Sequence, residues 1–151
     1  MNITGLLHVN INCSDFERSR RFYEQLGFRV LMHVDPRGEA EVAAAVGMSS
    51  YVVRGALMRH RDGSVIDLLE WCDPHHEHPP YERLDHLGIA RVALTTTDLD
   101  ADLAELTSAG VEFLSETPAQ VPAPGGGMTR FICFRDPDGT VLELVELAPR
   151  P

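Results

Sequence analysis

The amino-acid sequence contains an internal repeat, and this repeat restricts the folds that the chain can adopt. The segment from Asp15 to Gly27 recurs between Asp98 and Gly110, with 12 positions from the aspartate to the glycine in both copies. Self-similarity of this kind indicates a duplicated supersecondary unit. At 151 residues, the chain is long enough for one compact domain or for two small modules that share a core.

Both copies begin with the pattern of a helix N-terminus. Ser14 precedes Glu17 by three positions and Thr97 precedes Asp100 by three, which is the spacing of a capping box. Apolar residues follow at helical spacing, as in 99–106, and a glycine then suits the position after the last helical turn. We therefore predict one helix in each copy, with Ser14 and Thr97 as the N-caps.

Strand patterns surround both predicted helices. They cover residues 6–12, 28–32, 51–60 and 64–71 in the first half and residues 90–96, 111–114, 128–135 and 140–147 in the second. The order is βαβββ twice, which predicts an α+β fold of two modules. We expect a single domain with module 1 at about 4–72, a linker at 73–88 and module 2 at about 89–148.

Two segments rich in glycine, proline or small residues fall outside this pattern. Residues 36–50 and 117–127 are predicted to be mobile loops that can close over a ligand, although 39–46 also fits a short helix.

Composition excludes several classes of partner. The 13 basic and 23 acidic residues give a net charge of -10, which disfavours nucleic acid and anionic membranes. No run of about 18 apolar residues and no signal-peptide pattern occurs. Three widely spaced cysteines, Cys13, Cys72 and Cys133, suggest neither a disulfide framework nor a cysteine zinc site. We expect a protein of the reducing cytoplasm.

Two motifs at opposite ends of the chain resemble those of the vicinal oxygen chelate superfamily, which includes glyoxalases, bleomycin-resistance proteins and extradiol dioxygenases. The first combines residues 8–15 (HVNINCSD) with residues 22–28 (FYEQLGF), and the second is residues 136–144 (DPDGTVLEL). The resemblance implies that the modules form cupped mixed β-sheets around a small-molecule site. It also implies a divalent metal in many members, and a homodimer.

The repeat shows which residues occupy the four positions at which the resemblance implies metal ligands, namely His or Gln on each first strand and Glu on each last strand. His8 retains the first-strand position of module 1, whereas Arg91 replaces it in module 2. Glu143 retains the last-strand position of module 2, whereas Asp67 is one methylene shorter in module 1. Strand alternation places Glu70 on the face opposite to Asp67, where it would face solvent or anchor a loop.

Arg91 leaves two interpretations open, because a protonated guanidinium cannot ligate a metal. It can pair with Glu143 or Asp67, which leaves a binding pocket or a metal-free acid–base site. Alternatively it turns aside, and His8, Asp67 and Glu143 hold Fe, Mn, Ni or Zn with open positions for substrate oxygens.

These interpretations correspond to two functions. The first is a metal-dependent lyase, isomerase or dioxygenase, in which Glu143 and His8 are the catalytic residues and Arg91 binds a substrate carboxylate or enolate. The second is a metal-free protein that binds a small molecule or an antibiotic, as bleomycin-resistance proteins do. The histidines at 75, 76 and 78 are expected to form an exposed loop that scavenges metal.

Overall fold

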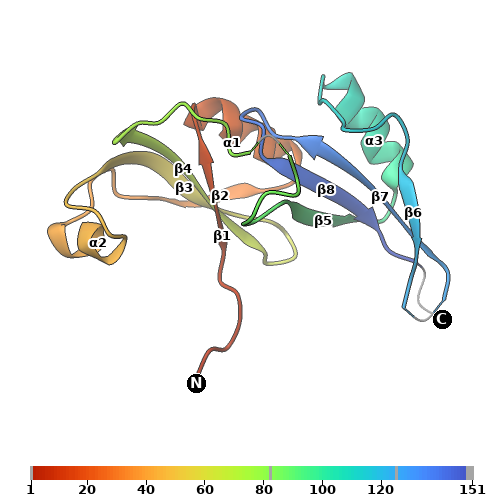
Figure 1. Cartoon of the computed structure of the whole chain (residues 1–151), viewed down its shortest axis with the longest axis horizontal. Helices are drawn as coiled ribbons and strands as arrows, with labels where there is room; N and C mark the ends of the chain where they lie inside the picture. The colour runs from red at the N-terminus through yellow and green to blue at the C-terminus, as the bar shows by residue number, and fades with distance from the viewer. Residues whose placement is uncertain (1, 82, 125, 149–151) are drawn as a thin grey trace. The chain divides into compact units, whose positions relative to one another are not determined.

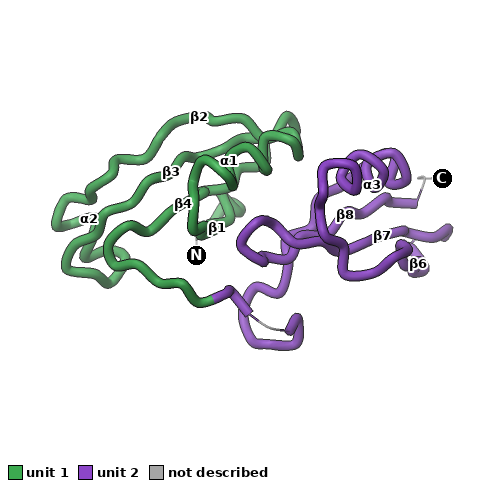
Figure 2. Tube along the Cα trace, turned by 90° about the horizontal axis from the view of Figure 1, so that it is seen from above, with its two compact units in different colours: residues 1–78 green, residues 79–151 purple. Residues whose placement is uncertain are grey.

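A computed structural model describes residues 2–81, 83–124 and 126–148. The chain divides into two compact units, residues 1–78 and residues 79–151 (Figure 2). Each unit contains one four-stranded sheet, and each sheet has a ten-residue helix between its first two strands in the sequence (Figure 1). We describe each unit by itself.

The described residues form eight strands and three helices, and the predicted α+β fold of two βαβββ modules is confirmed. The first unit contains β1 (Val9–Cys13), α1 (Phe16–Gln25), β2 (Arg29–His33), α2 (Ala40–Ala45), β3 (Val52–Arg59) and β4 (Val65–Asp73). The second contains β5 (Val92–Thr96), α3 (Leu99–Ser108), β6 (Ala119–Pro122), β7 (Met128–Arg135) and β8 (Val141–Glu146). Among these helices none is long and apolar enough to span a membrane.

Both sheets have the same strand order and the same mixture of directions. The orders are β1-β4-β3-β2 and β5-β8-β7-β6. The first and last strands of each unit pair in parallel, and the other neighbours pair antiparallel. This parallel pairing brings together two strands that are about 50 residues apart in the sequence, and it needs the intervening helix as part of the crossover.

The second unit departs from the sequence prediction after α3. Residues 111–114 were expected to form a strand, but they form only an isolated bridge between Phe113 and Phe134. The paired strand is β6, which lies inside the segment 117–127 that was predicted to be a mobile loop. Residues 114–117 form a bend between this bridge and β6, and Pro118, which has no amide hydrogen to donate, immediately precedes the edge strand.

The predicted N-caps are also wrong by one residue. The caps are Asp15 and Asp98, whose carboxylates accept the amide hydrogens of Arg18 and Ala101 at 3.0 Å. Ser14 and Thr97 lie one position earlier. The aspartates cap because this register places Phe16 or Leu99 at the first helical position, where each side chain is buried in the core.

A glutamate from the last strand of each unit holds the start of the helix. The Glu70 carboxylate accepts the Phe16 amide hydrogen at 2.9 Å, and the Glu146 carboxylate accepts that of Leu99 at 3.3 Å. Each bond satisfies an amide that has no partner within the helix. Glu70 faces away from Asp67, as predicted. It was expected to face solvent or to anchor a loop, and the structure shows that it binds the start of a helix.

An arginine on the adjacent strand completes this arrangement, which we call the helix clamp. Arg130 lies 3.1 Å from Glu146 and 2.6 Å from Asp100 in the first turn of α3. Arg54 similarly lies 3.2 Å from Glu17 in the first turn of α1, and 3.8 Å from Glu70. The helix clamp therefore repeats with the same residue types in both units, except that Asp100 replaces a glutamate.

The segment that precedes β5 is attached to the second sheet through one hydroxyl group. Tyr81 donates a hydrogen bond to the Ala90 carbonyl at 2.6 Å and accepts one from the Val141 amide at 2.9 Å. This phenol joins the beginning and the end of the segment 81–90 to the first residue of β8.

We predict that Glu146→Ala destabilises the protein, because it removes both the contact to the first turn of α3 and one of the two carboxylate partners of Arg130. The expected loss is about 1–2 kcal/mol in the free energy of unfolding. Urea denaturation measures it, with Glu105→Ala on the exposed face of α3 as the control. Equal midpoints for the two variants would show that the helix clamp contributes nothing to stability.

Candidate functional site

In the first unit, one face of the sheet is covered by α1 and the opposite face carries polar side chains. Ile11 and Cys13 of β1 are buried, whereas Asn10 and Asn12 are exposed on the other face. Asn10 pairs with Asp67 in the parallel register of β1 and β4. Side chains of paired residues project from the same face of a sheet, so Asp67 lies on the face of Asn10.

His8 and Asp67 form a pair of polar groups on this open face. The Nδ1 atom of His8 and the Oδ1 atom of Asp67 are both buried, and neither has a hydrogen-bond partner among the described residues. Burial raises the pKa of the Asp67 carboxyl, and the charge of His8 opposes the rise. A proton, a cation or a donor group of a ligand would satisfy these atoms.

The equivalent pair in the second unit has a different chemistry. The Nε atom of Arg91 lies 2.8 Å from a carboxylate oxygen of Glu143, and the two groups form a salt bridge. Glu143 is 8% exposed, while the Arg91 side chain is 43% exposed. The Glu143 carboxylate raises the pKa of Arg91 above its ordinary value. The guanidinium thus supplies the charge that a buried carboxylate needs.

The strand registers show that the two pairs are structurally equivalent. Glu143 pairs with Ala93, as Asp67 pairs with Asn10. Of the two arrangements that the sequence allowed for Arg91, pairing or turning aside, the structure shows that Arg91 pairs with Glu143. Across residues 2–81, 83–124 and 126–148, no three His, Cys, Asp or Glu side chains converge in a way that could hold a metal ion. The ligand set of His8, Asp67 and Glu143 stays a prediction.

Sequence reasoning did not identify Cys133 as part of this surface. Cys133 is the cross-strand partner of Glu143 and is half-buried. Burial and the Glu143 carboxylate raise the pKa of the Cys133 thiol, and Arg91 opposes this effect. The sequence did contain a signal for this position. Counting residues back from the turn at 136–139 gives the pairing of β7 with β8 and places Cys133 opposite Glu143.

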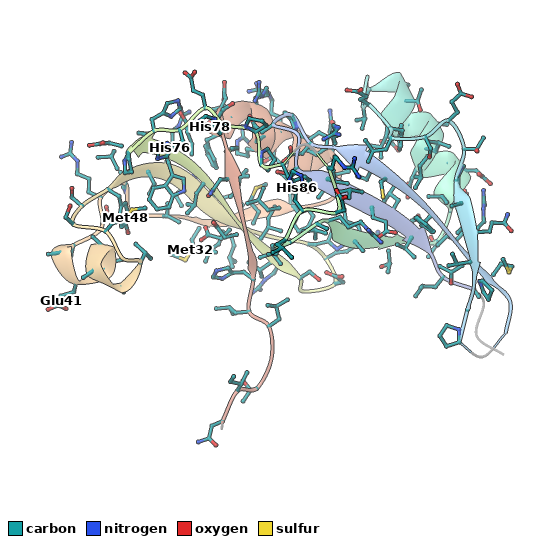
Figure 3. All side chains as sticks on the ribbon, viewed as in Figure 1. Met32, Glu41, Met48, His76, His78 and His86 are labelled. Atoms are coloured by element: carbon teal, nitrogen blue, oxygen red, sulfur yellow. The ribbon has the colours of Figure 1, made fainter. Side chains whose placement is uncertain are left out.

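The histidine-rich segment lies at the end of the first unit. His76 and His78 are on the chain that follows β4 (Figure 3). The Nδ1 atom of His75 is 3.0 Å from the Trp71 carbonyl oxygen, and its Nε2 atom is 3.8 Å from Glu77. All of these histidines are exposed, as predicted, and their metal scavenging stays a prediction.

Comparison with known proteins identifies relatives over nearly the whole chain. The model of the Glyoxalase/Bleomycin resistance protein/Dioxygenase superfamily matches residues 5–144. YwkD of Bacillus subtilis, described as uncharacterized, is 31% identical over 149 residues, which cover 97% of this chain and 99% of that protein. A glyoxalase family protein of Bacillus cereus has a similar structure, with 26% identity, a TM-score of 0.78 and 97% coverage of both chains.

A more distant structure shares the fold. The fosfomycin resistance protein FosX of Listeria monocytogenes, solved with Mn(II) and sulfate, is 16% identical with a TM-score of 0.61. The alignment covers 97% of this chain and 94% of FosX. The predicted homodimer and the predicted cytoplasmic location stay predictions.

We predict that the reactivity of Cys133 reports the charges beside it. The thiolate is the reactive form, so Glu143→Gln should shift the alkylation of Cys133 to lower pH and Arg91→Gln should shift it to higher pH. Alkylation by iodoacetamide across pH 7–10, read by mass spectrometry, measures the midpoint. The exposed Cys72 is the internal control, with the same midpoint in all three proteins. Shifts in the opposite directions would contradict the arrangement described above.

Proposed function

Because this chain belongs to the Glyoxalase/Bleomycin resistance protein/Dioxygenase superfamily, we propose that it binds a small molecule at Arg91 and Glu143. These residues lie on the face of the second sheet opposite the one that Glu146 and α3 occupy, and we call it the open face of that sheet. The observation that carries the proposal is the 2.8 Å salt bridge between these residues. In this function Arg91 recognises a carboxylate or enolate oxygen of the ligand, and Glu143 holds Arg91 in place and accepts a proton.

Arg91 has donor groups that remain for a ligand. Its Nε atom is bonded to Glu143, and no hydrogen bond is found for its two terminal nitrogens among the described residues. A guanidinium held at one edge by a buried carboxylate is already oriented, so a ligand oxygen gains hydrogen bonds at little entropic cost. This supports recognition of an oxygen-bearing small molecule.

Glu143 is better suited to accept a proton than to bind a metal. The permanent positive charge of Arg91 would repel a cation placed beside the carboxylate. A ligand anion that competes for Arg91 would free the carboxylate oxygen of Glu143 that Arg91 now holds at 2.8 Å, and this oxygen could then accept a hydrogen from the ligand. A ligand with an acidic hydrogen near its anionic group would therefore meet a base at Glu143.

We predict that Arg91→Gln weakens ligand binding at least tenfold without unfolding the protein. A thermal-shift screen of small carboxylates, with their amides as neutral analogues, should find compounds that raise the Tm of the wild type. Titration calorimetry should then give at least tenfold weaker binding for Arg91→Gln, because the donors are lost. Arg37→Gln, in the exposed segment before α2, is the control. Equal binding by Arg91→Gln would refute the proposal.

A metal-dependent enzyme is the second candidate, and the unpartnered His8 and Asp67 atoms favour it. Imidazole and carboxylate are ligand types that suit Fe, Mn, Ni or Zn. The metal would polarise adjacent oxygens of the substrate in a lyase, isomerase or dioxygenase reaction. Glu143 fits as the third ligand only if Arg91 releases it, and this requirement makes the candidate the weaker one. The Mn(II) in the FosX structure belongs to FosX and is not carried over to this chain.

We predict that Arg91→His gains affinity for divalent metals, because a neutral imidazole would then lie beside the Glu143 carboxylate. The expected gain over the wild type is at least tenfold for Zn²⁺ in equilibrium dialysis. His86→Ala, an exposed position, serves as the control.

The same measurement on the unmodified protein discriminates between the two candidates. Stoichiometric metal in the wild type that disappears in His8→Ala and Asp67→Asn, but not in His86→Ala, would replace the first candidate by the second.

A further inference from the structure

The open face of the second sheet carries a second arginine at the same level along the strands as Arg91, which we call the same row. Arg135 of β7 pairs with Val141 of β8. Arg91 immediately precedes Val92, which pairs with Leu142. It lies on the other side of β8 from Arg135, where the Tyr81 hydroxyl, rather than strand pairing, links Val141 to Ala90. Paired strands are about 4.8 Å apart, so the two arginine Cα atoms, with β8 and the inserted hydroxyl between them, are at least about 10 Å apart.

Arg135 has no acidic partner among the described residues. Its guanidinium makes one hydrogen bond, from an Nη atom to the Gly139 carbonyl oxygen at 3.2 Å. By contrast, the other half-buried arginines of the described residues, Arg20 and Arg130, each lie within 4.0 Å of a carboxylate. The chain contains 23 acidic but only 13 basic residues, so a half-buried arginine without a carboxylate is unusual.

The charges on this face therefore do not cancel. Arg91 and Arg135 carry two positive charges, and Glu143 compensates one of them. Each guanidinium has five donor hydrogens, and only one bond is found for each among the described residues. A partly buried surface with surplus donors and a surplus positive charge suits an oxyanion.

We propose that Arg91 and Arg135 form the two arms of an oxyanion site across Val141, and that the ligand of this protein carries a carboxylate or phosphate group bound by both arginines. The inference rests on the proposed function for the position of the ligand and adds its chemical class. Glu143 lies on the next row of the same face, where its charge excludes a second anionic group and its oxygen can accept a proton from the ligand.

The first unit provides a matched control. Arg59 pairs with Val65 and occupies the position that Arg135 has in the second unit. His8, however, takes the place of Arg91 in that row, so the first unit has one arm only. Removing Arg59 changes the net charge of the protein by the same amount as removing Arg135, without changing the proposed site.

Titration calorimetry of the full chain with inorganic phosphate and with malonate, at constant ionic strength, tests the site. We expect saturable 1:1 binding of at least one anion, and whichever binds more tightly identifies a phosphate or a carboxylate ligand. Arg135→Gln should weaken this binding at least tenfold, and Arg59→Gln should change it less than twofold. Arg135→Lys, which keeps the charge, should have an affinity between those of the wild type and Arg135→Gln. If Arg135→Gln does not fold, Arg135→Lys replaces it in the test.

The outcomes separate this inference from the proposed function. Wild-type affinity in a folded Arg135→Gln, together with loss of binding in Arg91→Gln, would overturn the two-armed site and leave the proposed function intact. Binding of neither anion, while a neutral compound from the thermal-shift screen binds through Arg91, would also overturn it. If no small molecule binds the wild type, both fail.

Discussion

The parallel pairing of the first and last strands in each unit determines where every residue of interest lies. Because side chains alternate along a strand, one register places Asp67 on the open face and Glu70 on the helix-covered face. The same register in the second unit places Glu143 and Glu146 on opposite faces. A slip by one residue would exchange the two faces, so the attachment of the helix and the geometry of the open face depend on each other.

The two units retain the same chemistry on one face and differ on the other. On the helix-covered face, both units use a strand glutamate and a strand arginine to hold the first turn of a helix. On the open face, the first unit has His8 and Asp67 with two unpartnered atoms, while the second has a salt bridge. Structural requirements therefore explain why the helix-covered faces are alike. They do not explain why the open faces differ, so we expect the function to depend on the open faces.

The sequence allowed the repeat, the fold class and the residues at the four equivalent positions to be predicted, because these depend on spacing alone. Spacing could not show which helix cap would form, since Ser14 and Asp15 are both good N-caps and burial of Phe16 decides between them. Cys133 and Arg135 were missed for a related reason. Their positions beside Glu143 and Val141 follow from the register of β7 with β8, which can be counted back from the turn at 136–139 only once the geometry of that turn is known.

The hydrogen bonds of Tyr81 have a consequence for how the two modules are joined. The phenol binds Ala90 at one end of the segment and Val141 at the other, so residues 81–90 are part of the second unit. An insertion or deletion within this segment would separate the hydroxyl from one of its two partners. The exposed residues 74–80, which precede Tyr81, can change in number without this loss, and variation in linker length is therefore confined to about half of the connection.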